Sequence, residues 1–195
     1  MSETRTGYFL VVCSANQCRS PLAAAILHSA CAARGLDVAV ESAGIAAVPG
    51  VPATFPTLEA AGAMGLDISE HRSRDLTAGM IRRADLVLAM ERRHLQEVVV
   101  TEPAAFARTF TLKELVRRGT EAGPRAPDET FADWLARVHK GRRPSDVVGL
   151  SVDDDVLDPT GNPLADHRST ADEIQGLVDA LLELLLPVDE PVAER

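Results

Sequence analysis

Near its amino end the chain reads Tyr8-Phe9-Leu10-Val11-Val12-Cys13-Ser14-Ala15-Asn16-Gln17-Cys18-Arg19-Ser20-Pro21-Leu22. The apolar run that ends at Cys13 predicts a buried strand, and the alanine-rich run that follows Pro21 predicts a helix. Proline suits the first turn of a helix, because the N–H group that it lacks would have no partner there. The residues between Cys13 and Arg19 are small or polar, so this stretch predicts a strand, a tight loop and a helix in direct succession.

The predicted loop is suited to binding an oxyanion. The first backbone N–H groups of a helix have no partners within the helix, and the helix dipole adds positive character at that end. Successive N–H groups in a tight loop form a concave anion site, and a guanidinium can bind two oxygens at once. A cysteine in this positive field favours its reactive thiolate form. We therefore predict that Cys13 is a nucleophile facing a tetrahedral dianion held by Ser14, Ala15, Asn16, Gln17, Cys18 and Arg19. The competing interpretation is a plain turn with a buried structural cysteine.

Length and composition indicate one domain over residues 1–195. The net charge is −9 and no basic block is present, which disfavours a nucleic-acid partner. No uncharged run approaches the ~20 apolar residues of a membrane span, so we expect no membrane partner. The three cysteines lie within the first 31 residues and do not suggest a disulfide framework. We expect a monomer in a reducing cytoplasm.

Helices and strands are expected to alternate along most of the chain. After the first strand, further strands are expected at Val38–Ser42, Asp85–Met90 and Thr109–Leu112. Helices are expected between them at Ser20–Arg34, Thr57–Met64, Leu76–Arg83 and Glu91–Val100, with a short one up to Arg118. Short apolar strands separated by helices are typical of a parallel sheet that is buried on both faces. The predicted fold class is α/β, an open doubly wound four-stranded parallel sheet flanked by helices with flavodoxin-like topology. The anion loop then lies at the carboxyl end of strand one, where such sheets bind ligands.

The later part of the chain is expected to add two helices. Composition predicts a loop at Gly119–Pro127 and then a helix capped by Asp128. The apolar face of that helix would consist of Phe131, Trp134, Leu135 and Val138. A longer helix at Thr170–Leu186 is expected to pack on the core, and the tail 187–195 is expected to be disordered.

Cleaving a phosphate ester through a cysteine also requires an acid for the leaving oxygen and a base for the water. One loop offers the carboxylates Asp153, Asp154, Asp155 and Asp158. An aspartate before a proline, as at Asp158-Pro159, is by itself a common turn. The neighbouring aspartates are expected to be a charge run exposed to solvent, and they lack the ligand pattern of a metal site.

The stretch Val11–Pro21 resembles the phosphate-binding loop of the low-molecular-weight protein tyrosine phosphatases. The resemblance covers about residues 6–118 and 152–186, and it is most specific from Cys13 to Pro21. It implies a cysteine-dependent phosphatase that forms a phosphocysteine intermediate, needs no cofactor or metal, and acts on a phosphorylated protein, above all on phosphotyrosine. It also selects Asp158, the aspartate of an Asp-Pro pair late in the chain, as the general acid and base.

The same resemblance assigns supporting roles to four further positions and a redox role to a fifth. Ser20 would donate a hydrogen bond to the Cys13 thiolate, and Asn16 is a residue type that tolerates a left-handed backbone in the loop. Ser42 and His71 match residues that hydrogen-bond to Asn16 and Ser20. Without the resemblance, they would be interpreted as a serine at the end of a strand and a histidine on the surface, with no role in the site. Cys18 matches a cysteine that in some members forms a reversible disulfide with the nucleophile. Cys31, by contrast, is expected to be a small core residue.

Two departures from the family leave the substrate open. Thr160 follows Asp158-Pro159 where members often carry an aromatic residue of the pocket wall, which puts a preference for phosphotyrosine in doubt. The segment at about 119–150 looks longer than the family needs and is interpreted as an insertion.

Three other functions compete with a tyrosine phosphatase. A phosphatase of phosphoarginine uses the same scaffold, and Gln17 at a lining position bears on that choice. An arsenate reductase would need relay cysteines, and none follows Cys31. A weakly catalytic anion-binding or redox-sensing module would use Cys13 and Cys18, but the set Cys13, Arg19 and Asp158 argues against it. A nucleotide-binding loop is excluded, because no Gly-Lys-Ser/Thr motif follows a glycine-rich turn.

Overall fold

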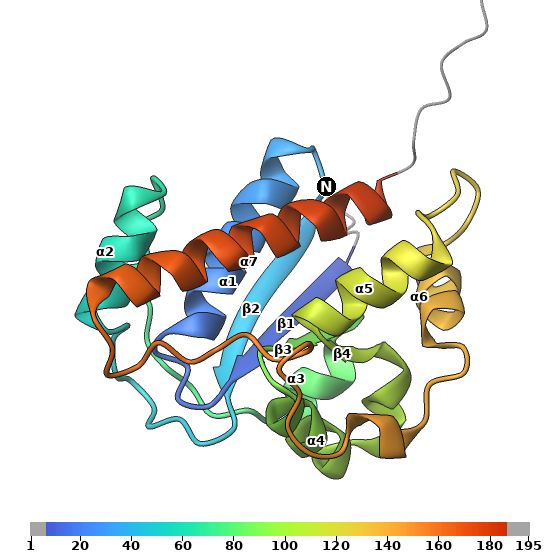
Figure 1. Cartoon of the computed structure of the whole chain (residues 1–195), viewed down its shortest axis with the longest axis horizontal. Helices are drawn as coiled ribbons and strands as arrows, with labels where there is room; N and C mark the ends of the chain where they lie inside the picture. Colours follow the sequence, from blue (N-terminus) through green and yellow to red (C-terminus); the bar gives the residue numbers. More distant parts are fainter. Residues whose placement is uncertain (1–6, 187–195) are drawn as a thin grey trace, which may run out of the picture.

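The computed structural model describes residues 7–186, and its centre is a four-stranded parallel sheet in the order β2-β1-β3-β4 (Figure 1). The strands are β1 (Gly7–Cys13), β2 (Val38–Gly44), β3 (Leu86–Ala89) and β4 (Thr109–Thr111). β1 lies in the middle, where Cys13 pairs with Gly44 of β2 and Val12 pairs with Ala89 of β3. The strand order reverses beside β1, so its carboxyl end lies at the switch point where ligands bind to such sheets.

Alternate residues of β1 pack on opposite faces of the sheet, as the period of a strand requires. Phe9, Val11 and Cys13 belong to the larger core, whereas Leu10 and Val12 belong to the smaller one. The larger core contains residues of α1 (Arg19–Ala33), α2 (Phe55–Ala63), α5 (Leu112–Ala122), α6 (Phe131–His139) and α7 (Leu164–Leu185). Residues of α3 (Ala78–Arg83) and α4 (Arg92–Thr101) contribute to the smaller core.

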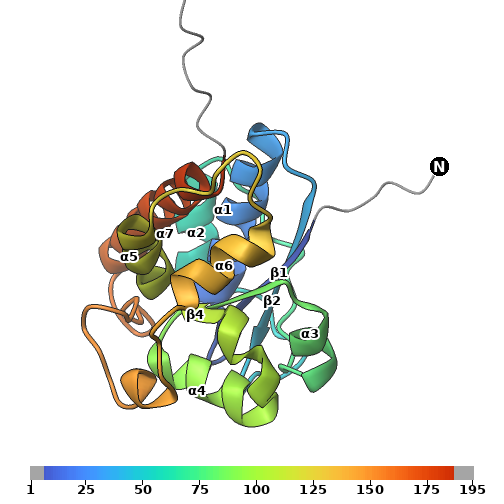
Figure 2. The same cartoon turned by 90° about the vertical axis from the view of Figure 1, so that its right-hand side faces the viewer.

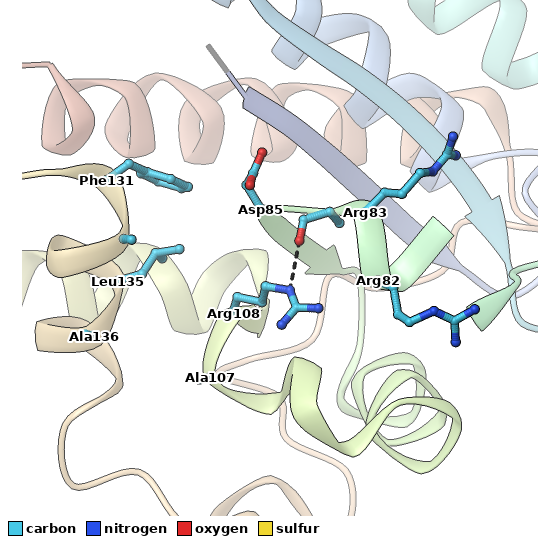
Figure 3. Close-up of a pocket in the computed structure, with 10 residues that line it drawn as sticks. Arg82, Arg83, Asp85, Ala107, Arg108, Phe131, Leu135 and Ala136 are labelled. Carbon is cyan, nitrogen blue, oxygen red and sulfur yellow. Dashed lines mark hydrogen bonds between the residues drawn. The ribbon is translucent and has the colours of Figure 1, made fainter. Parts of the chain in front are cut away.

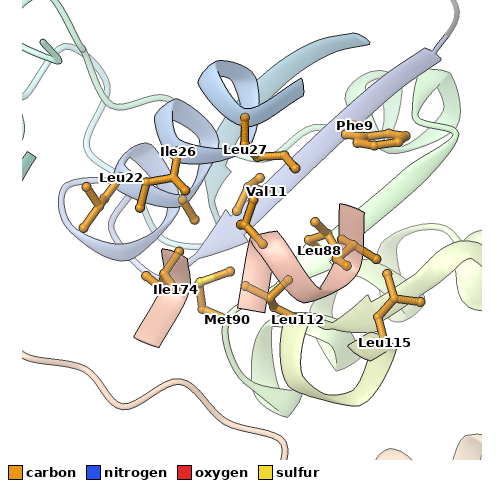
Figure 4. Close-up of a cluster of buried hydrophobic side chains, with 14 of the residues drawn as sticks. Phe9, Val11, Leu22, Ile26, Leu27, Leu88, Met90, Leu112, Leu115 and Ile174 are labelled. Atoms are coloured by element: carbon orange, nitrogen blue, oxygen red, sulfur yellow. The ribbon is translucent and has the colours of Figure 1, made fainter. Parts of the chain in front are cut away.

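Both faces of the sheet are therefore covered by helices, as Figure 2 shows in side view. Figure 4 shows the larger core, where Phe9 and Val11 of β1 meet Ile26 of α1, Leu115 of α5 and Ile174 of α7. The connections include two 3-10 helices, η1 (Pro103–Arg108) and η2 (Pro144–Val147). The α/β fold class, the parallel sheet and the place of the loop after the first strand are confirmed.

Three details of the predicted elements are wrong. The loop expected at Gly119–Pro127 begins only after Ala122, because Gly119 lies inside α5, where it packs against Trp134. The cap of α6 is Thr130 and not Asp128, since the Thr130 side chain accepts a hydrogen bond from the N–H of Asp133. The last helix begins at Leu164, several residues before the expected Thr170, because Pro163 sets its start.

Three other expectations concern the burial of side chains, the tail of the chain and membrane-spanning helices. Trp134, Leu135 and Val138 of α6 are buried, and so is Cys31 in α1, as expected. The expected disordered tail at 187–195 lies outside the described residues. Within residues 7–186, none of the helices has both the length and the apolarity needed to cross a membrane.

Candidate active site

The loop after β1 adopts its shape through one left-handed residue and one close backbone approach. Asn16 has a φ of 55°, and asparagine accepts this conformation more readily than most residues. Gly44 at the end of β2 lies against the loop, where a Cβ atom would come within 2.5 Å of the Ser14 carbonyl oxygen. Backbone bonds from Ile45 to Cys13 and from Ala46 to Ser14, both 3.0 Å, complete the contact. The end of β2 therefore holds the loop in place.

The side chain of Asn16 is fully buried and links the loop to its supports. Its Nδ2 donates to Ser20 Oγ and to Ser42 Oγ, both at 2.9 Å, and its Oδ1 accepts from the N–H of Arg74 at 3.0 Å. The Nε2 atom of His71 lies 2.7 Å from the Asn16 carbonyl oxygen. Burial is the main cause that lowers the pKa of His71. The structure thus brings together all four residues that were expected to support the loop.

Cys13 is buried at the end of β1, and its sulfur lies 2.9 Å from Ser20 Oγ. Asn16 donates to that hydroxyl oxygen, so the Ser20 proton is left for one of two acceptors, the sulfur or the Ala43 carbonyl oxygen at 3.5 Å, and the sulfur is the nearer. A hydrogen bond donated to a thiolate stabilises its charged form. The pair is therefore arranged to support Cys13 as an anion.

Arg19 opens α1 and is fully buried beneath the loop. One terminal nitrogen donates to Glu91 and, at 2.8 Å, to the Val156 carbonyl oxygen. The other donates to Asp158 Oδ2 at 2.6 Å. Its Nε atom has no hydrogen-bond partner among residues 7–186, so it is a buried donor that an anion in the loop can use.

Asp158 meets Arg19 from the loop that precedes α7. Its second carboxylate oxygen accepts from the N–H and the hydroxyl of Thr160, at 3.2 and 2.8 Å. Burial on its own raises the pKa of Asp158, but the charge of Arg19 and the bonds from Thr160 outweigh it, and the pKa lies below the usual value. The side chain remains 36% exposed, so it can reach a bound ligand.

These side chains surround a small pocket of about 120 Å³ at the carboxyl end of β1. It is lined by Cys13, Ser14, Ala15, Gln17, Cys18, Arg19, Thr54, Asp158 and Thr160. Every residue predicted to bind the anion lines it except Asn16, which supports the loop from behind. A volume of this size fits one tetrahedral oxyanion.

Sequence reasoning missed three residues around this pocket. Glu91 binds the buried guanidinium of Arg19, Thr54 forms part of the wall, and His94 Nε2 lies 2.9 Å from Ser14 Oγ. Burial lowers the pKa of His94 to about 4, so its ring is neutral near pH 7. The position of Glu91, directly after an apolar strand, could have pointed to it, because the ends of parallel strands meet at one edge of the sheet. Nothing in the sequence singles out Thr54 or His94.

Cys18 is buried beside His167 of α7, with 3.6 Å between the sulfur and Nδ1. Burial raises the pKa of its thiol to about 11. Cys13, Cys18 and Cys31 are all free thiols. The expected redox role of Cys18 stays a prediction.

The neighbouring aspartates are not the exposed charge run that the sequence suggested. Only Asp153 is exposed, whereas Asp154 and Asp155 are buried. Each of the two buried side chains has partners across the fold, with Arg92 and Arg117 around Asp154. Among residues 7–186, no group of three or more His, Cys, Asp or Glu side chains could hold a metal ion.

A larger hollow of about 460 Å³ lies at the other end of the strands, beside the residues that precede β3 and β4 (Figure 3). Its three arginines already have partners within the protein. Arg82 pairs with Glu102, Arg108 donates to the carbonyl oxygens of Ala84 and Ile81, and the Arg83 guanidinium lies over the Tyr8 ring, 5.3 Å from its centroid. The small pocket beside Cys13 is therefore the better candidate for an anion site.

Comparisons with known proteins identify the family of the chain. A match to the family described as low molecular weight phosphotyrosine protein phosphatase covers residues 8–130. The chain is 38% identical over 132 residues to the probable low molecular weight protein-tyrosine-phosphatase EpsP of Ralstonia solanacearum, covering 68% of this chain and 88% of that protein. It is 32% identical over 176 residues to a protein-arginine-phosphatase of Geobacillus stearothermophilus, covering 90% and 94%. The crystal structure of a low molecular weight protein tyrosine phosphatase from T. tengcongensis superposes with a TM-score of 0.71 at 34% identity, covering 92% of this chain and 99% of that one.

The fold and its loop define the class of protein, an α/β phosphatase whose anion loop follows the first strand. Within this class, the chain belongs to the low-molecular-weight protein tyrosine phosphatase family. The match to the family ends at residue 130, inside the segment 119–150. The interpretation of that segment as an insertion stays a prediction.

Proposed function

We propose that this phosphatase hydrolyses phosphotyrosine on proteins through a phosphocysteine intermediate. The observation that carries the proposal is the convergence of the Cys13 sulfur, the Arg19 guanidinium and the Asp158 carboxylate on one small pocket. The family match and the relatives named as tyrosine phosphatases support the substrate class. We also infer a reducing cytoplasmic environment, in keeping with the three free thiols.

In the first step, the Cys13 thiolate attacks phosphorus and the bond to the leaving oxygen breaks. Loop N–H groups and Arg19 stabilise the charge on the three equatorial oxygens. Asp158 donates its proton to the leaving oxygen. Ser20, 2.9 Å from the sulfur, stabilises the thiolate before attack and again when it departs.

In the second step, Asp158 is a carboxylate and takes a proton from water. The resulting nucleophile attacks phosphorus, the S–P bond breaks, and inorganic phosphate and the Cys13 thiolate are released. Between turnovers Asp158 binds Arg19, which favours the carboxylate. A phosphate dianion in the pocket replaces Asp158 as the partner of Arg19 and adds negative charge beside the carboxylate. Both changes favour the protonated form of Asp158.

The first test replaces the nucleophile. Cys13→Ser should abolish hydrolysis of an aryl phosphate assayed with a metal chelator present, because the hydroxyl does not ionise in this site. Cys31→Ala, which alters a buried thiol of α1 in the core, is the matched control and should retain activity. Hydrolysis by Cys13→Ser at the wild-type rate would refute the assignment.

The second test removes the acid. Asp158→Asn should lower kcat for a poor leaving group by about a hundredfold or more, the usual contribution of a general acid. The variant should still bind vanadate, because the loop and Arg19 are intact and Arg19 has lost the carboxylate that competes for it. Full turnover by Asp158→Asn would mean that another residue is the acid.

Phosphoarginine is the second candidate substrate. The protein-arginine-phosphatase of Geobacillus stearothermophilus aligns over 90% of this chain, and the pocket wall carries Thr54 and Thr160, with no aromatic side chain among its lining residues. A comparison of kcat/KM on matched peptides bearing phosphotyrosine or phosphoarginine decides between them. A higher kcat/KM on the phosphoarginine peptide would overturn the phosphotyrosine assignment and leave the phosphatase mechanism in place.

A further inference from the structure

Asp158 belongs to a segment with no regular secondary structure, residues 151–158, which we call the acid loop. A general acid must lie within hydrogen-bond reach of the leaving oxygen, and small displacements of such groups cost large factors in rate. A loop without a helix or strand of its own depends on side-chain and backbone contacts for its position. Those contacts therefore determine where Asp158 lies.

Besides the ion pair of Asp158 itself with Arg19, the loop is held by Asp154, whose side chain is only 2% exposed. Its Oδ2 accepts from Arg92 Nε at 3.1 Å and from a terminal nitrogen of Arg92 at 2.6 Å. Its Oδ1 accepts from Arg117 at 3.1 Å. Arg92 begins α4 and Arg117 lies on α5, so this carboxylate joins the acid loop to two helices.

The residues on either side of this carboxylate continue the attachment. Asp155 accepts from the N–H of Arg92 at 2.8 Å and from the N–H of Ser151 at 3.2 Å. The N–H of Val156 donates to Met90 at 2.8 Å, and its carbonyl oxygen accepts from Arg19. The loop is thus attached step by step until two residues before Asp158.

We propose that Asp154 is a positioning residue, which holds the acid loop over the pocket through its ion pairs with Arg92 and Arg117. This inference rests on the proposed role of Asp158 as general acid. Asp154 is not among the residues that line the pocket, so it acts through the position of the loop. Removing its charge leaves two guanidiniums without their shared carboxylate and loosens the loop, while the anion loop from Cys13 to Arg19 keeps its own supports.

The test compares Asp154→Asn with Asp153→Asn, which alters the exposed neighbouring carboxylate. Two aryl phosphates are used, one with a weakly basic and one with a strongly basic leaving group. Asp154→Asn should lower kcat/KM, which reports the leaving-group step, about tenfold on the second substrate and less than about threefold on the first, with an unchanged inhibition constant for inorganic phosphate. Asp153→Asn should match the wild type on both. Equal losses on the two substrates, or no loss, would overturn the proposal.

Two further measurements keep the answer clear. Arg117→Gln removes the ion pair of this half-exposed side chain with Asp154, together with a 3.8 Å pair with the exposed Glu121 on the same helix. It should show a smaller loss with the same dependence on the leaving group even if Asp154→Asn does not fold. Hydrogen exchange reports on the loop without any activity: amides of residues 151–158 should exchange faster in Asp154→Asn than in Asp153→Asn. Equal exchange overturns the role of Asp154. If exchange is faster in Asp154→Asn but the wild type hydrolyses neither substrate, the positioning role of Asp154 stands. The proposed function of the protein is then the part that is overturned.

Discussion

Asn16 combines two properties that the anion loop needs, a left-handed backbone and a side chain that bonds in three directions. Asn16→Gly retains the backbone freedom and loses the side-chain bonds, whereas Asn16→Ala loses both. We expect both variants to lower kcat/KM on an aryl phosphate, by about tenfold or more, because the loop donors are no longer held in place. In denaturant unfolding, Asn16→Ala should be less stable than Asn16→Gly by about 1 kcal/mol, the cost of a left-handed alanine. Equal stabilities would contradict the importance of the backbone conformation.

The residues of the site differ in how far sequence could predict them. Cys13 to Pro21 form one continuous stretch, so the succession of strand, cysteine, small loop, Arg-Ser-Pro and helix indicates an anion loop with a thiol. Ser42 and His71 required the resemblance to a family, because a serine at a strand end and a lone histidine carry no signal of their own. Glu91 and Asp154 were missed because their partners Arg19 and Arg92 are 72 and 62 positions away in the chain. Whether such a carboxylate is exposed or buried in an ion pair is decided by tertiary contacts.

At the scale of elements, Gly119 decides how α5 meets α6 and α7. A Cβ atom there would come within 3.1 Å of the Trp134 ring and 2.9 Å of Leu184. The ring cannot easily move, because its Nε1 donates to the Gly123 carbonyl oxygen at 3.0 Å. We expect Gly119→Ala to lower the free energy of unfolding by about 1–3 kcal/mol, as overpacking does.

Gly176 in α7 provides the matched control, since a Cβ atom there meets nothing within 4 Å. Gly176→Ala should raise the free energy of unfolding by roughly 0.5–1 kcal/mol, the normal gain of alanine over glycine in a helix. Urea unfolding of both variants measures this contrast. A gain for Gly119→Ala as well would show that α5 has room to shift away from Trp134.

The same glycine explains where element prediction failed. Strands such as Leu86–Ala89 are continuous apolar runs between polar residues, and their type and place could be predicted from the sequence. The end of α5 could not, because glycine normally marks the end of a helix, whereas Gly119 is inside one for the sake of close packing. The loop expected from its composition was therefore placed too early.

At the scale of the whole molecule, several buried groups make stability depend on pH in the same direction. The pKa values of His94, Glu91 and Asp154 are all lowered in the folded protein, so each group binds fewer protons there than in the unfolded chain. Stability from such a group is complete above its unfolded pKa and is lost as the pH falls through its folded pKa. The two carboxylates make the stability fall below about pH 4, since that is where free carboxylates titrate. His94 makes the stability fall at higher pH, between its ordinary pKa of 6.5 and its folded pKa of about 4.

The pKa values of His71 and His139 are also lowered, so a comparison of a His94 variant with the wild type is needed to isolate the contribution of His94. With a shift from 6.5 to about 4, the buried ring should cost the molecule about 2 kcal/mol of stability between pH 7 and pH 5. His94→Gln, which cannot be protonated, should lose less stability over that range by this amount when urea unfolding is measured at both pH values. His28→Gln, at an exposed position of α1, is the control and should follow the wild type. Parallel losses in His94→Gln and the wild type would mean that the ring can take up a proton in the folded state, and that its burial against Ser14 does not keep it neutral.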